Sequence, residues 1–271
     1  MITEYDLWDA LGRITFATSM ETAWHVFQEQ MAEFGFDRIL YASSRLRVVE
    51  GQLHPADLHD ALVLSNHSQD YLDEFFGKNH YLHAPNVRWV SHNTGAVSWR
   101  ETAEAAAKGK LNAKEMAVVN LNTRHGIVAG YTLSFPEASS RAVGGMGISA
   151  SSLTQDAVDA IWSASGHVIK SLAGVAHLKF NDLPYKNGPT LTPRQREALQ
   201  LIAEGKTIAE VAAKMGRTER TVEKHLRLAR QAMNADTTAQ AILKASAQNQ
   251  FFHVNHRESR GKPWEPTLKS G

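Results

Sequence analysis

A series of basic and hydroxyl side chains near the C-terminus has the types and spacing needed to contact nucleic acid. Arg220, Lys224 and Arg227 recur every three or four residues, which places them on one face of a helix over 219–230. Arginine can bind guanine through two hydrogen bonds, glutamate can accept one from cytosine, and threonine can contact phosphate or the thymine methyl group. The candidate DNA-contacting residues are Thr207, Thr218, Arg220, Thr221, Glu223, Lys224, Arg227 and Arg230.

Three short helices are predicted to position these side chains. Residues 191–205 begin with a Thr-Pro pair, which suits a helix start, and end with a glycine, which suits a helix stop. A second helix is expected within 207–216 and a third within 218–230, with Val222 and Leu226 facing inward. Two short helices joined by about three residues that include a glycine form a helix-turn-helix, whose second helix enters the major groove.

The formal charge is divided unevenly along the chain. Residues 1–188 contain 15 Lys and Arg against 20 Asp and Glu, a net charge of −5, whereas residues 189–271 contain 14 against 8, a net charge of +6. A charged face on an isolated helix is usually only solvated. Here the basic surroundings favour DNA binding, because phosphate neutralisation supplies much of the affinity of a nucleic-acid-binding module.

The chain is predicted to contain two domains. Helices are expected at 22–34, 70–76, 101–120 and 154–180, and strands at 38–42, 46–49, 95–99, 127–135 and 144–151. This order predicts an α+β fold, an α-β-α sandwich with a central, mainly antiparallel sheet, followed by a small all-α four-helix domain. We expect a first domain over 1–180, a Pro- and Gly-containing linker over 181–190, the helix-turn-helix domain over 191–248 and a partly disordered tail over 249–271.

Other chemistry has little support in the sequence. The absence of cysteine excludes disulfides, cysteine zinc sites and a thiol nucleophile. His54, Asp57 and His59 could bind a metal, but they lie in a predicted loop with nothing to complete a site. The glycines of 144–147 lack the Lys-Ser/Thr of a phosphate-binding loop and are interpreted as a turn that enters a strand. We therefore predict no enzyme activity, no metal and no cofactor.

The sequence also argues against a membrane location. The first ten residues are acidic, unlike a secretory signal, and no window reaches about 18 consecutive apolar residues. We expect a cytoplasmic protein.

Five segments of the basic domain form a recognisable pattern: Leu191–Glu197, Glu204–Thr207, Glu210–Ala212, Thr221–His225 and Thr238–Ile242. Together they resemble the helix-turn-helix domain of LuxR-type transcription regulators over residues 191–246. The resemblance implies a homodimer that binds double-stranded DNA at a roughly two-fold symmetric site, with a fourth helix over 236–247 contributing to dimerisation.

A more diffuse pattern runs from residue 71 to residue 126. Pro85, Trp99 and Gly126 keep the separation found in the N-acyl-homoserine-lactone-binding domain of quorum-sensing LuxR-type regulators, which this region resembles. In that pattern Tyr71 takes the place of a Trp, Phe75 of a Tyr and Ala84 of an Asp. The ligand-binding residues that the resemblance implies are Tyr71, Phe75, Ala84, Trp99, Ser149 and a neighbouring histidine, His83.

The three substitutions change the polar chemistry of this predicted pocket. In the family the Trp donates to the lactone carbonyl, the Tyr hydroxyl to the acyl carbonyl, and the Asp accepts from the ligand amide. Tyr71 can still donate, but Phe75 has no hydrogen-bonding group and Ala84 cannot accept. A buried amide without its partner costs about 1–3 kcal/mol, or about one to two decades of affinity. His83, or His80 one helical turn earlier, is an alternative acceptor.

Two functional readings follow from these substitutions. In the first, the chain is a transcription regulator that responds to an N-acyl-homoserine lactone or a related small signal molecule. In the second, it is an orphan LuxR-type regulator whose degenerate pocket binds no ligand or a different one. An enzyme with a regulatory tail and a response regulator with a degenerate receiver are weaker alternatives, because neither a catalytic set nor an alternating strand-helix order is visible.

Overall fold

The computed structural model describes residues 4–46, 60–185 and 191–251. The chain separates into two compact units, Met1–Thr190 and Leu191–Gly271, each with its own apolar core. The predicted strand at 46–49, the loop with His54 and His59, part of the linker and most of the C-terminal tail lie outside the described residues.

A five-stranded antiparallel sheet organises the first unit. Its strands are β1 (Arg38–Ser44), β2 (Leu62–Ser65), β3 (Gly95–Ser98), β4 (Gly130–Ser134) and β5 (Val143–Ser149), in the spatial order β2-β1-β5-β4-β3. Because side chains alternate between the two faces of a strand, each strand contributes residues to two separate layers. The antiparallel sheet confirms the predicted fold class.

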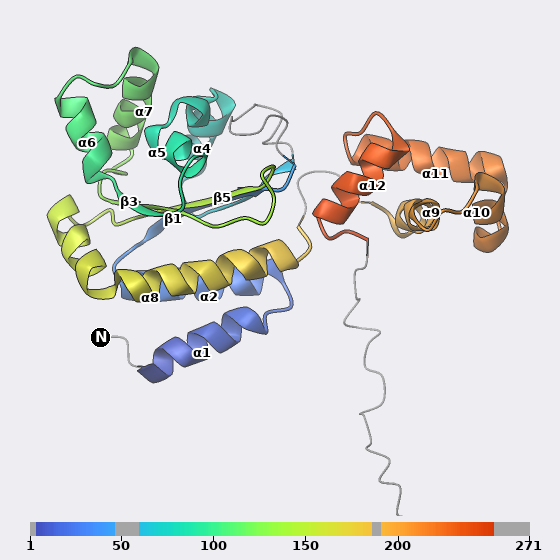
Figure 1. Cartoon of the computed structure of the whole chain (residues 1–271), viewed down its shortest axis with the longest axis horizontal. Helices are drawn as coiled ribbons and strands as arrows, with labels where there is room; N and C mark the ends of the chain where they lie inside the picture. The colour runs from blue at the N-terminus through green and yellow to red at the C-terminus, as the bar shows by residue number, and fades with distance from the viewer. Residues whose placement is uncertain (1–3, 47–59, 186–190, 252–271) are drawn as a thin grey trace, which may run out of the picture. The chain divides into compact units, whose positions relative to one another are not determined.

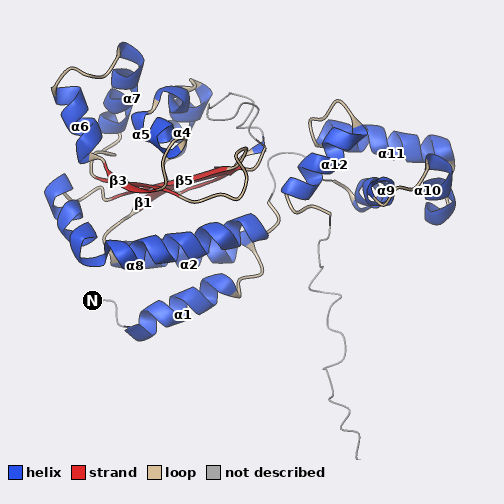
Figure 2. Cartoon of the chain, in the orientation of Figure 1, coloured by secondary structure: helices blue, strands red, loops and turns tan. Residues whose placement is uncertain are grey.

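Helices cover both faces of this sheet. One face carries α2 (Met20–Glu33) and α8 (Gln155–Asp182), with α1 (Glu4–Thr15) on their outer side (Figure 1). The other face carries α4 (Gln69–Gly77), the 3-10 helix η1 (His80–His83), α5 (Pro85–Val90), α6 (Arg100–Ala107) and α7 (Ala113–Arg124). Figure 2 shows the strands between the two helical layers, the predicted α-β-α sandwich.

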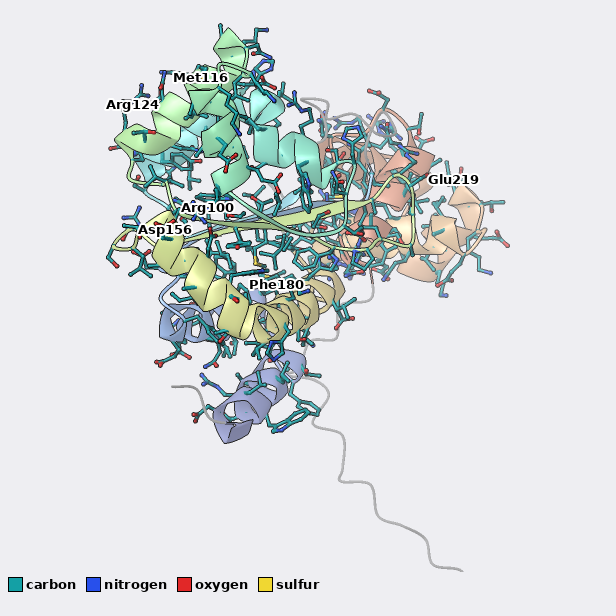
Figure 3. The ribbon with its side chains drawn as sticks, turned by 60° about the vertical axis from the view of Figure 1, so that its left-hand side comes forward. Arg100, Met116, Arg124, Asp156, Phe180 and Glu219 are labelled. Atoms are coloured by element: carbon teal, nitrogen blue, oxygen red, sulfur yellow. The ribbon has the colours of Figure 1, made fainter. Side chains whose placement is uncertain are left out.

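The long helix α8 is fixed to the sheet at both ends. Thr154 caps its start. Arg100 at the start of α6 forms ion pairs with Asp159 at 2.7 Å and with Asp156 at 2.5 Å, and Arg100 and Asp156 are labelled in Figure 3. Further along, Trp162 stacks on Tyr131 of β4 with ring centroids 4.0 Å apart. The apolar spacing of α8 therefore faces the sheet, as its periodicity predicts.

A buried polar cluster joins α8 to the sheet near the helix C-terminus. The Tyr41 hydroxyl lies 3.0 Å from His177 Nδ1, and His177 Nε2 lies 3.4 Å from a Glu137 carboxylate oxygen. The His177 ring also stacks on Phe135 at 4.3 Å. Burial, with a smaller contribution from the charge of Arg45, lowers the pKa of His177 to about 4, so the imidazole is neutral at pH 7.

Two sequence-based predictions are wrong in this unit. The single helix expected at 101–120 is the pair α6 and α7, because Gly109 has a φ of +64° and Asn112 starts a new helix through a capping box with Glu115. The glycines of 144–147 lie inside β5 and form no turn. A Cβ at Gly144 would lie 2.5 Å from His177 Cε1, and one at Gly145 would lie 2.8 Å from Val90 Cγ1, so close packing explains both glycines.

The second unit contains four helices: α9 (Pro193–Ala203), α10 (Ile208–Met215), α11 (Glu219–Ala232) and α12 (Thr238–Ala247). Threonine side chains at 192, 207, 218 and 237 accept hydrogen bonds from the first turn of each helix. Gly216, with a φ of +62°, ends α10 in the left-handed conformation that favours glycine. These caps fix a compact helix-turn-helix around buried Val211, Val222 and Leu226.

Candidate functional site

A mainly apolar cavity lies between the sheet and the layer formed by α4, η1, α5, α6 and α7. Its volume is about 180 Å³. The floor includes Gly145, against which Val90 packs closely, and Gly147, whose missing side chain leaves space beside Trp99 in the wall. Cavities of this kind, apolar with a few polar groups, are typical binding sites for small organic molecules.

Tyr71, Asn122 and His67 form an uncharged polar cluster in the lining of the cavity. The buried Tyr71 hydroxyl donates to Asn122 Oδ1 of α7 at 3.1 Å, while the Tyr71 ring stacks on Phe75 at 5.3 Å and lies 4.9 Å from the His67 ring. Burial raises the pKa of the Tyr71 phenol, and burial together with the charge of Arg38 lowers the pKa of His67 to about 4. Both side chains are therefore neutral at pH 7.

Further hydrogen bonds hold other polar groups of the lining. Trp99 Nε1 donates to the Thr132 hydroxyl at 2.8 Å, and the Thr102 hydroxyl donates to Asn86 Oδ1 at 2.9 Å. Within the part of the chain that the structure describes, no Asp, Glu, Lys or Arg lines the cavity. The site can therefore offer hydrogen bonds and apolar contact, but no ion pair.

The second unit presents a basic helix face. On α11 the side chains of Arg220, Glu223, Lys224 and Arg227 are exposed, on the side opposite to the buried core residues. No ion pair among residues 191–251 includes Arg220, Lys224 or Arg227, so these three charges can interact with phosphate or base edges.

The remaining candidate DNA-contacting residues are partly occupied within the unit. The Thr207 and Thr218 hydroxyls cap α10 and α11, and the Thr221 hydroxyl lies 3.0 Å from that of Thr218. Arg230 is half-buried and donates to the Thr238 hydroxyl at 3.1 Å, which joins α11 to α12. Of the candidate DNA-contacting residues on α11, the exposed ones are therefore Arg220, Glu223, Lys224 and Arg227.

Comparison with known proteins accounts for both units. Residues 19–180, more than half of the chain, match the autoinducer binding domain family, and residues 189–233 match the family described as sigma-70, region 4. The chain belongs to the LuxR-type family of transcription regulators. This is a family of transcription factors and not of enzymes, as the sequence analysis predicts.

Individual LuxR-type relatives cover different parts of the chain. The transcriptional activator LuxR of Aliivibrio fischeri is 25% identical over 190 residues, 69% of this chain and 73% of that protein. The transcriptional activator AnoR of Acinetobacter nosocomialis is 47% identical over 55 residues, 20% of this chain and 23% of that protein.

Solved LuxR-type structures show the same architecture. The N-acylhomoserine-lactone-dependent LuxR family factor CepR2 of Burkholderia cenocepacia superposes with a TM-score of 0.50 at 17% identity, covering 64% of this chain and 93% of CepR2. At this identity the likeness shows the fold alone.

The cavity of this LuxR-type chain brings together four of the six residues proposed from the sequence. Tyr71, Phe75, Ala84 and Trp99 all line it. Ser149 does not, although its place on β5 puts it on the same sheet face as Gly145 and Gly147, and its buried hydroxyl has no hydrogen-bond partner among the described residues. His83 also lies outside the lining, in η1, as does His80, so the described cavity offers neither histidine as the alternative acceptor.

Several polar residues of the lining are missing from the sequence-based set, among them Thr132, Asn122 and His67. Thr132 could have been found, because it alternates with Gly130 and Ser134 along a predicted strand and so shares their face. Asn122 follows the predicted end of a helix at 120, which the structure extends to Arg124. His67 precedes α4 in a segment without strong periodicity, so no local signal distinguishes it.

Two further properties concern only the described residues. No helix among them is long and apolar enough to cross a membrane. No group of three or more His, Cys, Asp or Glu side chains in these ranges is arranged to hold a metal ion.

Proposed function

We propose that this LuxR-type regulator responds to a small, largely apolar signal molecule, such as an N-acyl-homoserine lactone, that binds in the cavity of the first unit. The observation that carries the proposal is the cavity itself, which has mainly apolar walls, glycines in its floor and a few hydrogen-bonding side chains in its lining. Such a lining provides burial for an acyl chain and orientation for a polar head.

The ligand contacts that we propose are those of the sequence pattern, with roles adjusted to the geometry. Trp99 and Phe75 supply apolar walls, and Ala84 leaves room where the family has a carboxylate. Tyr71 supplies a hydroxyl oxygen that can accept a hydrogen bond, because its hydrogen is donated to Asn122. A contact from Ser149 or His83 requires a local change in β5 or η1, because neither side chain lines the cavity.

A thermal melt with a panel of N-acyl-homoserine lactones tests this function, together with mass spectrometry of small molecules extracted from the protein purified from its host. A ligand at a hundred times its Kd adds about 2.7 kcal/mol of stability. For a unit of this size the melting temperature should then rise by about 5–11 °C. The variant Gly147→Leu, which fills the cavity floor, should lose this rise.

A stable, ligand-free protein that no lactone stabilises contradicts the signal-binding function. That result would leave a LuxR-type regulator that needs no ligand or binds a different one.

For the second unit we propose that residues 191–248 are the DNA-binding domain, joined through 181–190 to a sensing domain over 1–180. The exposed cationic side chains of α11 support major-groove contact, with Thr207, Thr218 and Arg230 near the phosphates. We further propose a cytoplasmic homodimer on a roughly two-fold symmetric DNA site. Sedimentation of the protein with and without duplex DNA tests the dimer, and a monomer in both conditions contradicts it.

A further inference from the structure

We propose that Asn122 is a specificity-determining residue of the cavity, whose side-chain amide donates a hydrogen bond to an uncharged carbonyl group in the polar head of the signal molecule. The inference rests on the proposed ligand-binding function and specifies the chemical class that the cavity accepts. It concerns a residue outside the set that the sequence pattern implies.

The backbone of Asn122 is held firmly at the end of α7. Its carbonyl oxygen accepts from His125 N at 3.1 Å and from Ile127 N at 2.8 Å, which closes the C-terminal turn of the helix. The side chain is half-buried and lines the cavity. The backbone from which this side chain extends is therefore fixed by secondary structure.

The amide is also oriented. Its Oδ1 accepts from the Tyr71 hydroxyl at 3.1 Å, and Tyr71 is itself held by stacking on Phe75. No hydrogen bond among the described residues uses Asn122 Nδ2. The two N–H groups of Nδ2 are thus the donors that a ligand can satisfy, and a carbonyl oxygen is the matching acceptor.

Electrostatics decides between neutral and charged acceptors. A carboxylate could also accept from Nδ2, but burying an ion without a counter-charge is costly. The described lining contains no Lys or Arg, and His67 beside Tyr71 is neutral. A cationic head is disfavoured for the same reason, since the described lining contains no Asp or Glu.

A matched pair of probes tests the charge selectivity. The neutral probe is N-octanoyl-homoserine lactone, and the charged probe is its ring-opened carboxylate, which has the same acyl chain and amide. Titration calorimetry on the full-length protein should show at least about 100-fold tighter binding of the lactone. Equal affinity for the two probes, or tighter binding of the carboxylate, overturns the uncharged head group.

Variants at position 122 test the residue itself. Asn122→Leu keeps a similar volume without the amide and should weaken lactone binding by about 10- to 100-fold. Asn122→Asp replaces the donor by a carboxylate and should weaken it at least as much. The control Asn120→Asp makes the same chemical change at an exposed position of the same helix, outside the cavity, and should bind like the wild type.

The outcomes separate this inference from the proposed function. If the wild type binds the lactone and both Asn122 variants, folded by circular dichroism, bind it equally well, the role of Asn122 is wrong while the ligand-binding function stands. If the wild type binds neither probe and no lactone in the panel, the proposed function fails and this inference fails with it.

Discussion

Acidification from pH 7 to pH 5 should destabilise the first unit through two histidines, His177, which is buried, and His67, which is half-buried. Burial lowers the folded-state pKa of His177 and of His67 to about 4 each, whereas an unfolded histidine has a pKa of about 6.5. Because the folded state resists protonation, the stabilising effect is fully present above pH 6.5 and is lost as the pH falls towards 4. Linkage gives a loss of about 2 kcal/mol for each histidine between pH 7 and pH 5.

Glu137 offsets part of this loss of stability on acidification. Burial raises the pKa of its carboxyl group, so the folded state takes up this proton more readily than the unfolded state does. The net loss for the wild type is therefore smaller than the sum of the two histidine contributions, and a variant comparison isolates His177.

The informative variant is His177→Gln, with His167→Gln, at an exposed position on the same helix, as its matched control. His177→Gln should lower stability at pH 7, because it disrupts the contacts with Tyr41 and Phe135. Its further loss between pH 7 and pH 5 should be about 2 kcal/mol smaller than that of the wild type. The control should keep the wild-type acid loss.

Urea unfolding followed by tryptophan fluorescence measures this loss in the correct unit, because five of the six tryptophans precede residue 190. The free energy of unfolding is compared at the two pH values for each variant. Equal acid losses in the wild type and in His177→Gln would refute the argument that burial keeps this imidazole neutral.

Three more perturbations have expected outcomes. Gly130→Ala should lower the free energy of unfolding by about 1–3 kcal/mol in urea, because its Cβ would lie 2.3 Å from the Ile148 carbonyl oxygen. The control is Gly147→Ala, whose Cβ meets nothing closer than 3.5 Å, and an equal or larger loss in the control would contradict this steric reason. Arg227→Ala should weaken binding to a generic DNA duplex and reduce the salt slope by about 1 in fluorescence anisotropy, whereas a slope equal to the wild type would remove Arg227 from the phosphate contacts. Thr218→Ala should lower the free energy of unfolding of the second unit by about 1 kcal/mol, because it removes the N-cap of α11. Urea unfolding followed by circular dichroism measures this loss, and an unchanged midpoint would show that the cap is dispensable.

The parts of the fold that the sequence predicts well are those with local signals. Threonines at 192, 207 and 218 predict three helix starts, and Gly216 predicts a helix end, because capping depends only on neighbouring backbone groups. The strands β1, β3, β4 and β5 are also predicted, since each overlaps a segment whose local composition suits a strand. The edge strand β2 (Leu62–Ser65) is not among the strands that the sequence predicts.

The polar cluster of Tyr71, Asn122 and His67 could not be predicted, because it depends on contacts between residues that are far apart in the sequence. Tyr71 and Asn122 are 51 residues apart and meet only after α4 and α7 pack on the same sheet face. The break between α6 and α7 is also hard to predict, since the alanine-rich pattern continues across it and only Gly109 and Asn112 mark it. A family pattern locates the pocket, but not the side chains that replace its usual polar contacts.

The two glycines in the cavity floor are expected to evolve under different constraints. At Gly145 a larger residue would collide with Val90, so packing alone maintains the glycine. At Gly147 an added methyl group would meet Trp99 at an ordinary distance of 3.5 Å, and its burial would add stability. A lineage that no longer used the cavity would gain from filling position 147, so the residue found there in descendants of this chain becomes a record of whether natural selection still keeps the space open.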